Sequence, residues 1–116
     1  MPKVMIVDDD LTTVSLLETL LSMDGFDVSL VARGQEVLER AHQDKPDIFL
    51  IDQHLTDMDG TDIVRALRAD ATFAKAPIVV ASGMNVETAA LKAGANLFLI
   101  KPLEPGSLAN TLSSLL

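Results

Sequence analysis

Polar side chains of three kinds follow short apolar runs at four places along the chain. The runs "VMIV", "IFLI", "IVVA" and "LFLI" are followed by Asp8, Asp9 and Asp10, by Asp52, by Ser82 and by Lys101, respectively. Two carboxylates about 4 Å apart repel by roughly 4 kcal/mol at an effective dielectric constant near 20, so such a group calls for a cation. Ligation by oxygen alone favours a hard divalent ion, and Mg²⁺ fits best. An ionised aspartate can attack a phosphoryl group once a metal, a lysine and a hydroxyl offset the negative charge. These residue types therefore predict an aspartyl-phosphate site with Asp52 as the acceptor.

The elements that must position these residues are short strands separated by helices. Apolar runs at 3–7, 26–32, 47–51, 77–81 and 96–100 alternate with stretches of helical period. Most of these runs are nearly continuous in Val, Ile, Leu and Phe, which is typical of strands covered on both faces. The alternation predicts an α/β fold, a doubly wound five-stranded parallel sheet with helices on both faces. Ligands of such sheets bind beyond the carboxyl ends of the strands, so the polar residues are expected to converge there.

Composition limits the classes of function. With 116 residues and 48% hydrophobic content, residues 1–116 are expected to form one domain with a sizeable core. The chain has no cysteine, which excludes disulfides and thiolate metal sites. A net charge of −8 argues against a nucleic-acid partner. We see no signal-peptide layout and no apolar stretch near the roughly 20 residues that cross a bilayer. A cytoplasmic protein without membrane contact is expected.

A second aspartate competes with Asp52 for the chemical role. Asp57 opens "DMDGT", which has the letters of the D-x-D-G-T signature of haloacid dehalogenase-type phosphatases. In that signature the first aspartate directly follows an apolar strand, whereas Asp57 follows the loop-like "DQHLT". Asp57 and Asp59 are instead predicted to make turn and cap contacts leading into the next helix. This interpretation leaves Asp52 as the acceptor.

The chain resembles the receiver domains of two-component response regulators over essentially its whole length. The resemblance rests on six stretches in this order, "IVDDD" (6–10), "FLID" (49–52), "MDG" (58–60), "IVVASG" (78–83), "AGA" (93–95) and "FLIKP" (98–102). It implies a flavodoxin-like (βα)5 fold with strand order 2-1-3-4-5. It also implies a signalling switch that takes a phosphoryl group from a phosphohistidine on a sensor histidine kinase or a histidine phosphotransfer protein. No enzyme activity on an external substrate is expected.

The resemblance assigns a role to each residue of the site. Asp52 would accept the phosphoryl group, and Ser82 and Lys101 would contact it. The metal, Mg²⁺ or alternatively Mn²⁺, would be held by Asp8, Asp9, Asp52 and the backbone carbonyl of His54. Ser82 and Phe98 would act as the switch pair, shifting the surface formed by the fourth helix, the fifth strand and the fifth helix. The peptide bond before Pro102 is commonly cis in this family.

Some features depart from the family pattern. Thr56 stands where the loop after the acceptor usually carries proline, and Gln53 where an apolar residue is common. The spacing from Ser82 to Lys101 is about one helical turn, or roughly 3.6 residues, shorter than usual, which predicts a short fourth helix. Asp10 is predicted to cap the first helix. The alternative function is that of a degenerate receiver, a protein-binding module that works without phosphorylation.

Overall fold

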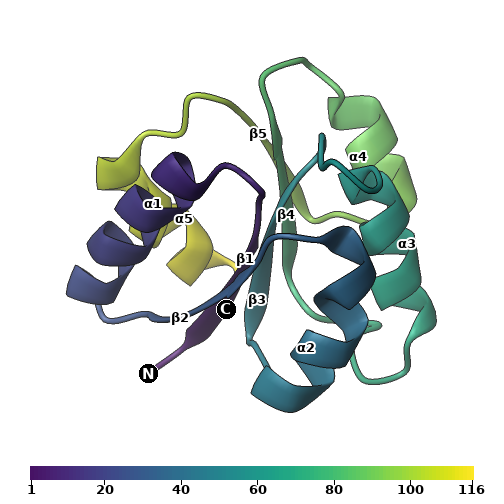
Figure 1. The fold of residues 1–116 in the computed structure, drawn as a ribbon, viewed down its shortest axis with the longest axis horizontal. Coiled ribbons are helices and arrows are strands. Elements are labelled where there is room, and N and C mark those ends of the chain that lie inside the picture. Colours follow the sequence, from purple (N-terminus) through teal and green to yellow (C-terminus); the bar gives the residue numbers. More distant parts are fainter.

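The computed structural model describes residues 1–116, apart from the side chain of Pro105. Strands and helices alternate along the chain as β1 (Lys3–Val7), α1 (Leu11–Met23), β2 (Asp27–Val31), a 3-10 turn η1 (Gly34–Glu36), α2 (Val37–Asp44), β3 (Ile48–Asp52), α3 (Gly60–Ala69), β4 (Ile78–Ser82), α4 (Glu87–Ala93), β5 (Leu97–Ile100) and α5 (Pro105–Ser114). All neighbouring strands pair in parallel in the order β2-β1-β3-β4-β5. This confirms the predicted doubly wound fold and its strand order (Figure 1).

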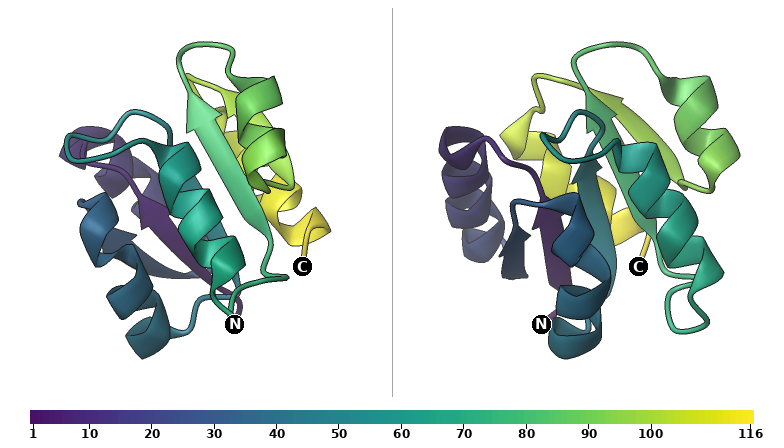
Figure 2. Two further views of the ribbon diagram at one scale, coloured as in Figure 1. Left: turned by 90° about the vertical axis from the view of Figure 1, so that its right-hand side faces the viewer. Right: turned by 45° about the vertical axis from the view of Figure 1, so that its right-hand side comes forward.

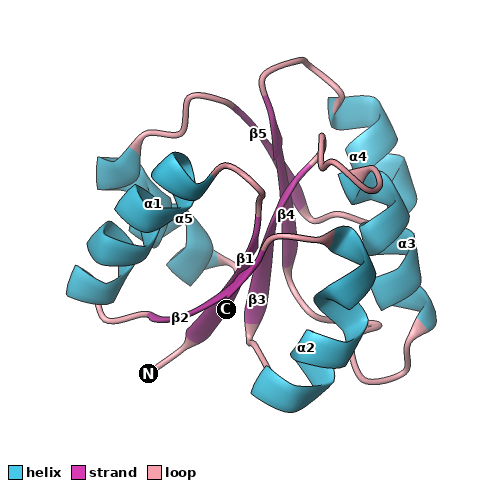
Figure 3. Ribbon diagram, viewed as in Figure 1, coloured by secondary structure: helices cyan, strands magenta, loops and turns pink.

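Helices cover both faces of the sheet, with α1 and α5 on one side and α2, α3 and α4 on the other (Figure 3). Successive side chains of a strand point to opposite faces, so each strand contributes to two separate cores. On the α1 and α5 side, Ile6 and Leu50 pack with Leu17 and Leu112. On the other side the core contains Val7, Ile51, Val80, Val64 and Leu67. The near-continuous apolar runs of the sequence are explained by this burial on both faces.

The strand ends place the polar residues at one edge of the sheet. The third and fourth strands each begin and end one residue later than the apolar runs predicted, so Asp52 and Ser82 are the last residues of β3 and β4. The segment after β1 and the loop after β3 lie at the same edge, at the carboxyl ends of the strands (Figure 2). The Lys101–Pro102 peptide bond after β5 is cis, as the resemblance implied.

The fourth helix has seven residues, which confirms the prediction of a short helix. It ends at Gly94, whose φ of 121° lies in a region that side chains rarely adopt. Arg68 of α3 fixes this end, because its Nε donates to the carbonyl of Gly94 at 2.9 Å and its NH1 to that of Ala76 at 2.7 Å. Its NH2 also donates to the side-chain oxygen of Asn96 at 2.9 Å. The α3–β4 and α4–β5 connections are therefore joined through one guanidinium. None of the described helices is long and apolar enough to cross a bilayer.

Candidate functional site

Three aspartates and one lysine meet at the carboxyl ends of β1, β3 and β5. One carboxylate oxygen from each of Asp8, Asp9 and Asp52 lies within 4.8 Å of the others. The Lys101 amine reaches into this cluster, 2.9 Å from Oδ2 of Asp8 and 3.1 Å from Oδ1 of Asp52. The side chains of Asp8 and Asp52 are only 6% and 10% exposed, so these charges interact with little screening by water. The structure thus brings together four residues that the sequence singled out.

Burial and neighbouring charges shift the acid–base equilibria of the cluster. Burial raises the pKa of the Asp52 carboxyl, and repulsion by Asp8 and Asp9 adds to this effect, against the opposing pull of Lys101. Burial alone would lower the pKa of the Lys101 ammonium, but its hydrogen bonds to Asp8 and Asp52 outweigh burial and raise it. Lys101 therefore stays protonated, whereas the surroundings of Asp52 disfavour its ionised form.

The two predicted switch residues lie on the neighbouring strands β4 and β5. Ser82 is fully buried at the end of β4, and its hydroxyl accepts a hydrogen bond from the Met84 backbone N–H at 3.1 Å. Phe98 is 8% exposed and packs into the core beneath α3 and α4. The aromatic ring is thus already turned inward in this structure.

The loop after Asp52 closes tightly on the strand that precedes it. Gln53 is buried, and its side-chain oxygen accepts the backbone N–H of Thr61 in the first turn of α3 at 3.0 Å. A Cβ at Gly60 would lie 2.5 Å from the carbonyl oxygen of Asp52, so only glycine allows this approach. An apolar residue is common at this position in the family that the chain resembles, and the polar Gln53 is explained by its hydrogen bond to the first turn of α3.

Two further contacts hold the middle of the same loop. His54 has an exposed side chain, and its backbone forms an antiparallel bridge with Asp59. Across the cluster, the backbone N–H and the hydroxyl of Thr56 both donate to Oδ2 of Asp9, at 2.9 and 2.6 Å. The predicted metal ligand Asp9 is therefore tied to the loop that follows the predicted acceptor.

Asp57 anchors this loop to the connection after β2. Its two carboxylate oxygens accept the backbone N–H groups of Gly34 and Gln35, both at 3.0 Å. These bonds lower the pKa of the Asp57 carboxyl. Asp57 thus has a cap role, as predicted, but at the start of η1 and not of α3. Asp59 occupies the N-cap position of α3, where Gln53 supplies the hydrogen bond instead.

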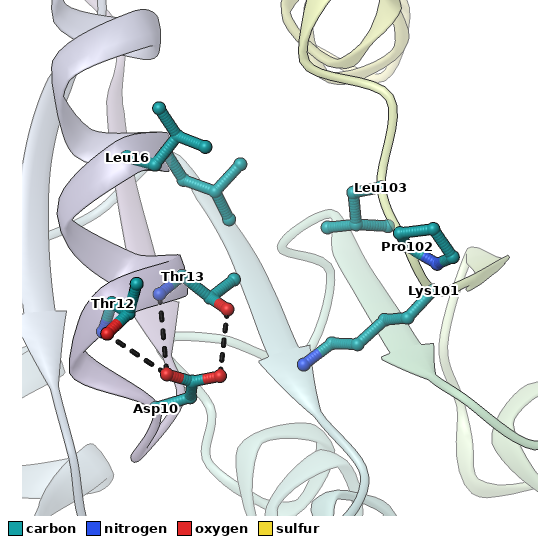
Figure 4. Close-up of a pocket in the computed structure, with 8 residues that line it drawn as sticks. Asp10, Thr12, Thr13, Leu16, Lys101, Pro102 and Leu103 are labelled. Atoms are coloured by element: carbon teal, nitrogen blue, oxygen red, sulfur yellow. Dashed lines mark hydrogen bonds between the residues drawn. The ribbon is translucent and has the colours of Figure 1, made fainter.

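A groove of about 680 Å³ runs beside the cluster, between α1 and the loop after β5. Figure 4 shows Asp10 at the start of α1, where it accepts from the backbone N–H groups of Thr12 and Thr13, as the predicted cap of that helix. Leu16, which is 55% exposed, lies on the same helix and lines the groove opposite Leu103. Lys101 also lines it, so the groove adjoins the acidic cluster.

The donor set of the cluster fits a small hard cation. Asp8, Asp9 and Asp52 offer carboxylate oxygens only, which suit Mg²⁺ and Mn²⁺ and not the softer metals that prefer nitrogen or sulfur. The buried negative charge exceeds the single positive charge of Lys101. A divalent cation would neutralise the excess.

The fold and this site define a class of protein: a flavodoxin-like α/β domain with an acidic pocket and a lysine at the carboxyl ends of its strands. Residues 4–113 match the response regulator receiver domain family. The chain belongs to that family. Receiver domains are signalling switches of two-component systems that bind Mg²⁺ in an acidic pocket and work with histidine kinases.

Individual relatives agree with this assignment. The chain is 34% identical over 116 residues to the transcriptional regulatory protein PrrA of Mycobacterium tuberculosis, covering 99% of the chain and 50% of PrrA. It is 29% identical to the DNA-binding response regulator MtrA of the same species, covering 91% of the chain and 46% of MtrA. The structure of the chemotaxis response regulator CheY4 of Vibrio cholerae superposes with a TM-score of 0.93 at 28% identity, covering 100% of this chain and 99% of that one. The chain spans about half the length of the curated relatives it matches.

Proposed function

We propose that residues 1–116 act as one phosphoacceptor switch in which Asp52 takes a phosphoryl group from a phosphohistidine. The observation that carries this proposal is the position of Lys101, whose amine bridges Asp8 and Asp52 at 2.9 and 3.1 Å. One oxygen of Asp52 faces this amine, and Lys101 also lines the groove beside α1. A carboxylate, a fixed ammonium and a cation-binding acid pair are the groups that phosphoryl transfer needs.

Asp8, Asp9, Asp52 and the backbone carbonyl of His54 would hold the metal. Mg²⁺, or Mn²⁺ in its place, supplies positive charge that offsets repulsion between the incoming phosphoryl group and the carboxylates. The amine of Lys101 moves from the carboxylates to a phosphoryl oxygen, and the hydroxyl of Ser82 donates to another.

The chemical step is a single displacement at phosphorus. An oxygen of Asp52 forms the new P–O bond while the P–N bond to the donor imidazole breaks, and the imidazole nitrogen leaves with the electron pair. Asp52 acts in its ionised form, which the ammonium of Lys101 favours by its hydrogen bond and its charge. The product is an acyl phosphate on this chain, so no external substrate is turned over.

The phosphoryl group then changes the surface through Ser82 and Phe98. It adds about −1.5 to −2 charge, and Ser82 must give up its hydrogen bond from Met84 to turn toward it. Phe98 is inward already, so phosphorylation shifts the population of its inward and outward positions. The surface of α4, β5 and α5 carries the result to the next protein.

The groove between α1 and the loop after β5 is a suitable docking site for the phosphodonor protein. It presents Leu16 and Leu103 beside Lys101, so a protein helix packed on it would carry its phosphohistidine to the cluster. The donor is a sensor histidine kinase or a histidine phosphotransfer protein in the cytoplasm.

Intact mass after incubation with Mg²⁺ and a small-molecule phosphodonor tests this function. We expect one phosphoryl adduct in wild type and in Asp57→Asn, and none in Asp52→Asn. An adduct that persists in Asp52→Asn would refute the acceptor assignment. No adduct in any of the three, with Mg²⁺ bound, would favour the protein-binding module that works without phosphorylation.

A further inference from the structure

We infer that Thr56 is a positioning residue for the metal site, because it holds the Asp9 carboxylate in place before a cation arrives. The inference rests on the proposed function, in which Asp9 is a metal ligand. Both donors of Thr56, the backbone N–H and the hydroxyl, meet the same oxygen of Asp9 at 2.9 and 2.6 Å. The two residues lie 47 positions apart in the sequence, so this contact joins the segment after β1 to the loop after β3.

Asp9 needs such a restraint more than its partners do. Asp8 is buried and held by Lys101, and Asp52 is also bonded to Lys101. Asp9 is only half-buried, and Lys101 does not reach it in the contacts described. Repulsion by the two neighbouring carboxylates therefore pushes Asp9 toward water, and the two hydrogen bonds from Thr56 oppose that movement.

The geometry leaves Asp9 able to bind a metal. Both donors of Thr56 occupy Oδ2, so Oδ1 keeps its lone pairs for a cation. Hydrogen bonds to the oxygen that does not ligate orient a carboxylate and are a common support for metal ligands. A ligand that is already oriented loses less conformational freedom on binding, which strengthens the binding.

Thr56 can act in this way because the loop around it is itself fixed. On one side of Thr56, Gln53 is bonded to Thr61, and on the other Asp57 is bonded to the backbone of Gly34 and Gln35. Thr56 thus presents its donors from a loop anchored at both ends. The residue type matters as well, since valine would lose the hydroxyl and proline would lose both donors.

The test is a Mg²⁺ titration of metal-free wild type, Thr56→Val and Thr56→Ser. The chain has no tryptophan or tyrosine, so amide NMR shifts are a better reporter than intrinsic fluorescence. We expect Thr56→Val to bind Mg²⁺ about tenfold more weakly, the lower end of the effect of losing a supporting hydrogen bond. Thr56→Ser keeps both donors and should bind like wild type. Thr56 is exposed, so neither change removes a core side chain.

The same substitution in an Asp9→Asn background shows whether Thr56 acts through Asp9. There we expect Thr56→Val to leave the weakened Mg²⁺ affinity unchanged. If Thr56→Val alone binds Mg²⁺ as tightly as wild type, the inference is overturned. Tighter binding would also overturn it, because Thr56 would then compete with the metal for Asp9. A wild type that fails to bind Mg²⁺ would instead overturn the proposed metal site itself.

Discussion

An Asp52→Asn variant is expected to unfold at a higher temperature than wild type when no divalent metal is present. The carboxylate of Asp52 lies in a cluster with Asp8 and Asp9, and Lys101 is the cation that contacts it. Burial is the main cause of the raised pKa of Asp52, and it exceeds the attraction by Lys101, so the folded state disfavours the ionised carboxyl. Asparagine removes the charge and keeps the shape.

The distances set the size of the effect. At an effective dielectric constant of about 20, an ammonium 3.1 Å away attracts the Asp52 carboxylate by about 5 kcal/mol. Each of the two carboxylates, taken at 4.8 Å, repels it by about 3.5 kcal/mol. These attractions and repulsions nearly cancel, so the burial of the carboxylate, the main cause of its raised pKa, decides the sign, and we expect the free energy of unfolding to rise by about 1–2 kcal/mol. With an unfolding entropy of about 2.1 cal/mol/K per residue, Tm rises by about 4–8 °C.

Thermal unfolding at several pH values measures this difference. A carboxyl whose pKa is raised by folding lowers stability increasingly as the pH rises from its ordinary value of 3.8 through the raised pKa, so the advantage of Asp52→Asn should grow with pH over that range. The advantage should disappear below pH 3.8, where the carboxyl is protonated in both the folded and the unfolded protein. Excess Mg²⁺ should also shrink it, because ligand binding stabilises wild type more than a variant that lacks one ligand.

Asp57→Asn is the matched control, with the same chemical change in the same loop. Its carboxylate accepts two backbone N–H groups and its pKa is lowered by folding, so the variant should have a lower Tm at pH 7. A metal-free Asp52→Asn protein less stable than wild type at pH 7 would refute the reasoning, since the attraction by Lys101 would then dominate the cluster.

Three further substitutions test other parts of the site. Lys101→Met should destabilise the metal-free protein by about 2 kcal/mol, because Asp8 and Asp52 lose their counter-charge. The same variant should bind Mg²⁺ more tightly, and calorimetric titration showing weaker binding would contradict the idea that the ammonium and the metal share the pocket. Gly60→Ala should lower the free energy of unfolding by about 1–3 kcal/mol, because its Cβ would lie 2.5 Å from the carbonyl oxygen of Asp52. Chemical denaturation measures this change, and an unchanged free energy of unfolding would mean that the loop can open freely. Leu16→Asp should slow phosphotransfer from a protein donor but not from a small phosphodonor, and equal slowing of both would exclude the groove as the docking site.

Residues at strand ends could be predicted from the sequence because burial on both faces leaves a plain signal. An apolar run that stops at Asp52 or Lys101 marks the end of a strand, and parallel pairing brings such ends to one edge. The cluster of Asp8, Asp9, Asp52 and Lys101 follows from that rule and the family resemblance.

Contacts made by loops could not be predicted in the same way. The bond between Thr56 and Asp9 and the cap from Asp57 to Gly34 depend on loop conformation, which has no periodic signal. The sequence predicted that Asp57 makes a turn or cap contact leading into α3. In the structure its carboxylate caps η1 instead. The contact between His42 and Asp70, which lie 2.8 Å apart in space and 28 positions apart in the sequence, likewise has no signal in the sequence.

The hydrogen bonds of Arg68 join the Gly94 end of the short helix α4 to α3. Gly94 is held by the guanidinium at 2.9 Å, whereas the other end follows the exposed residues 83–85 after Ser82. A displacement of that other end would therefore rotate the helix about Gly94. Seven residues give an arm of about 10 Å, so a displacement of about 1 Å beside Ser82 becomes a rotation of about 5°. A partner that contacts α4 would therefore register the signal most strongly near Met84 and least near Gly94.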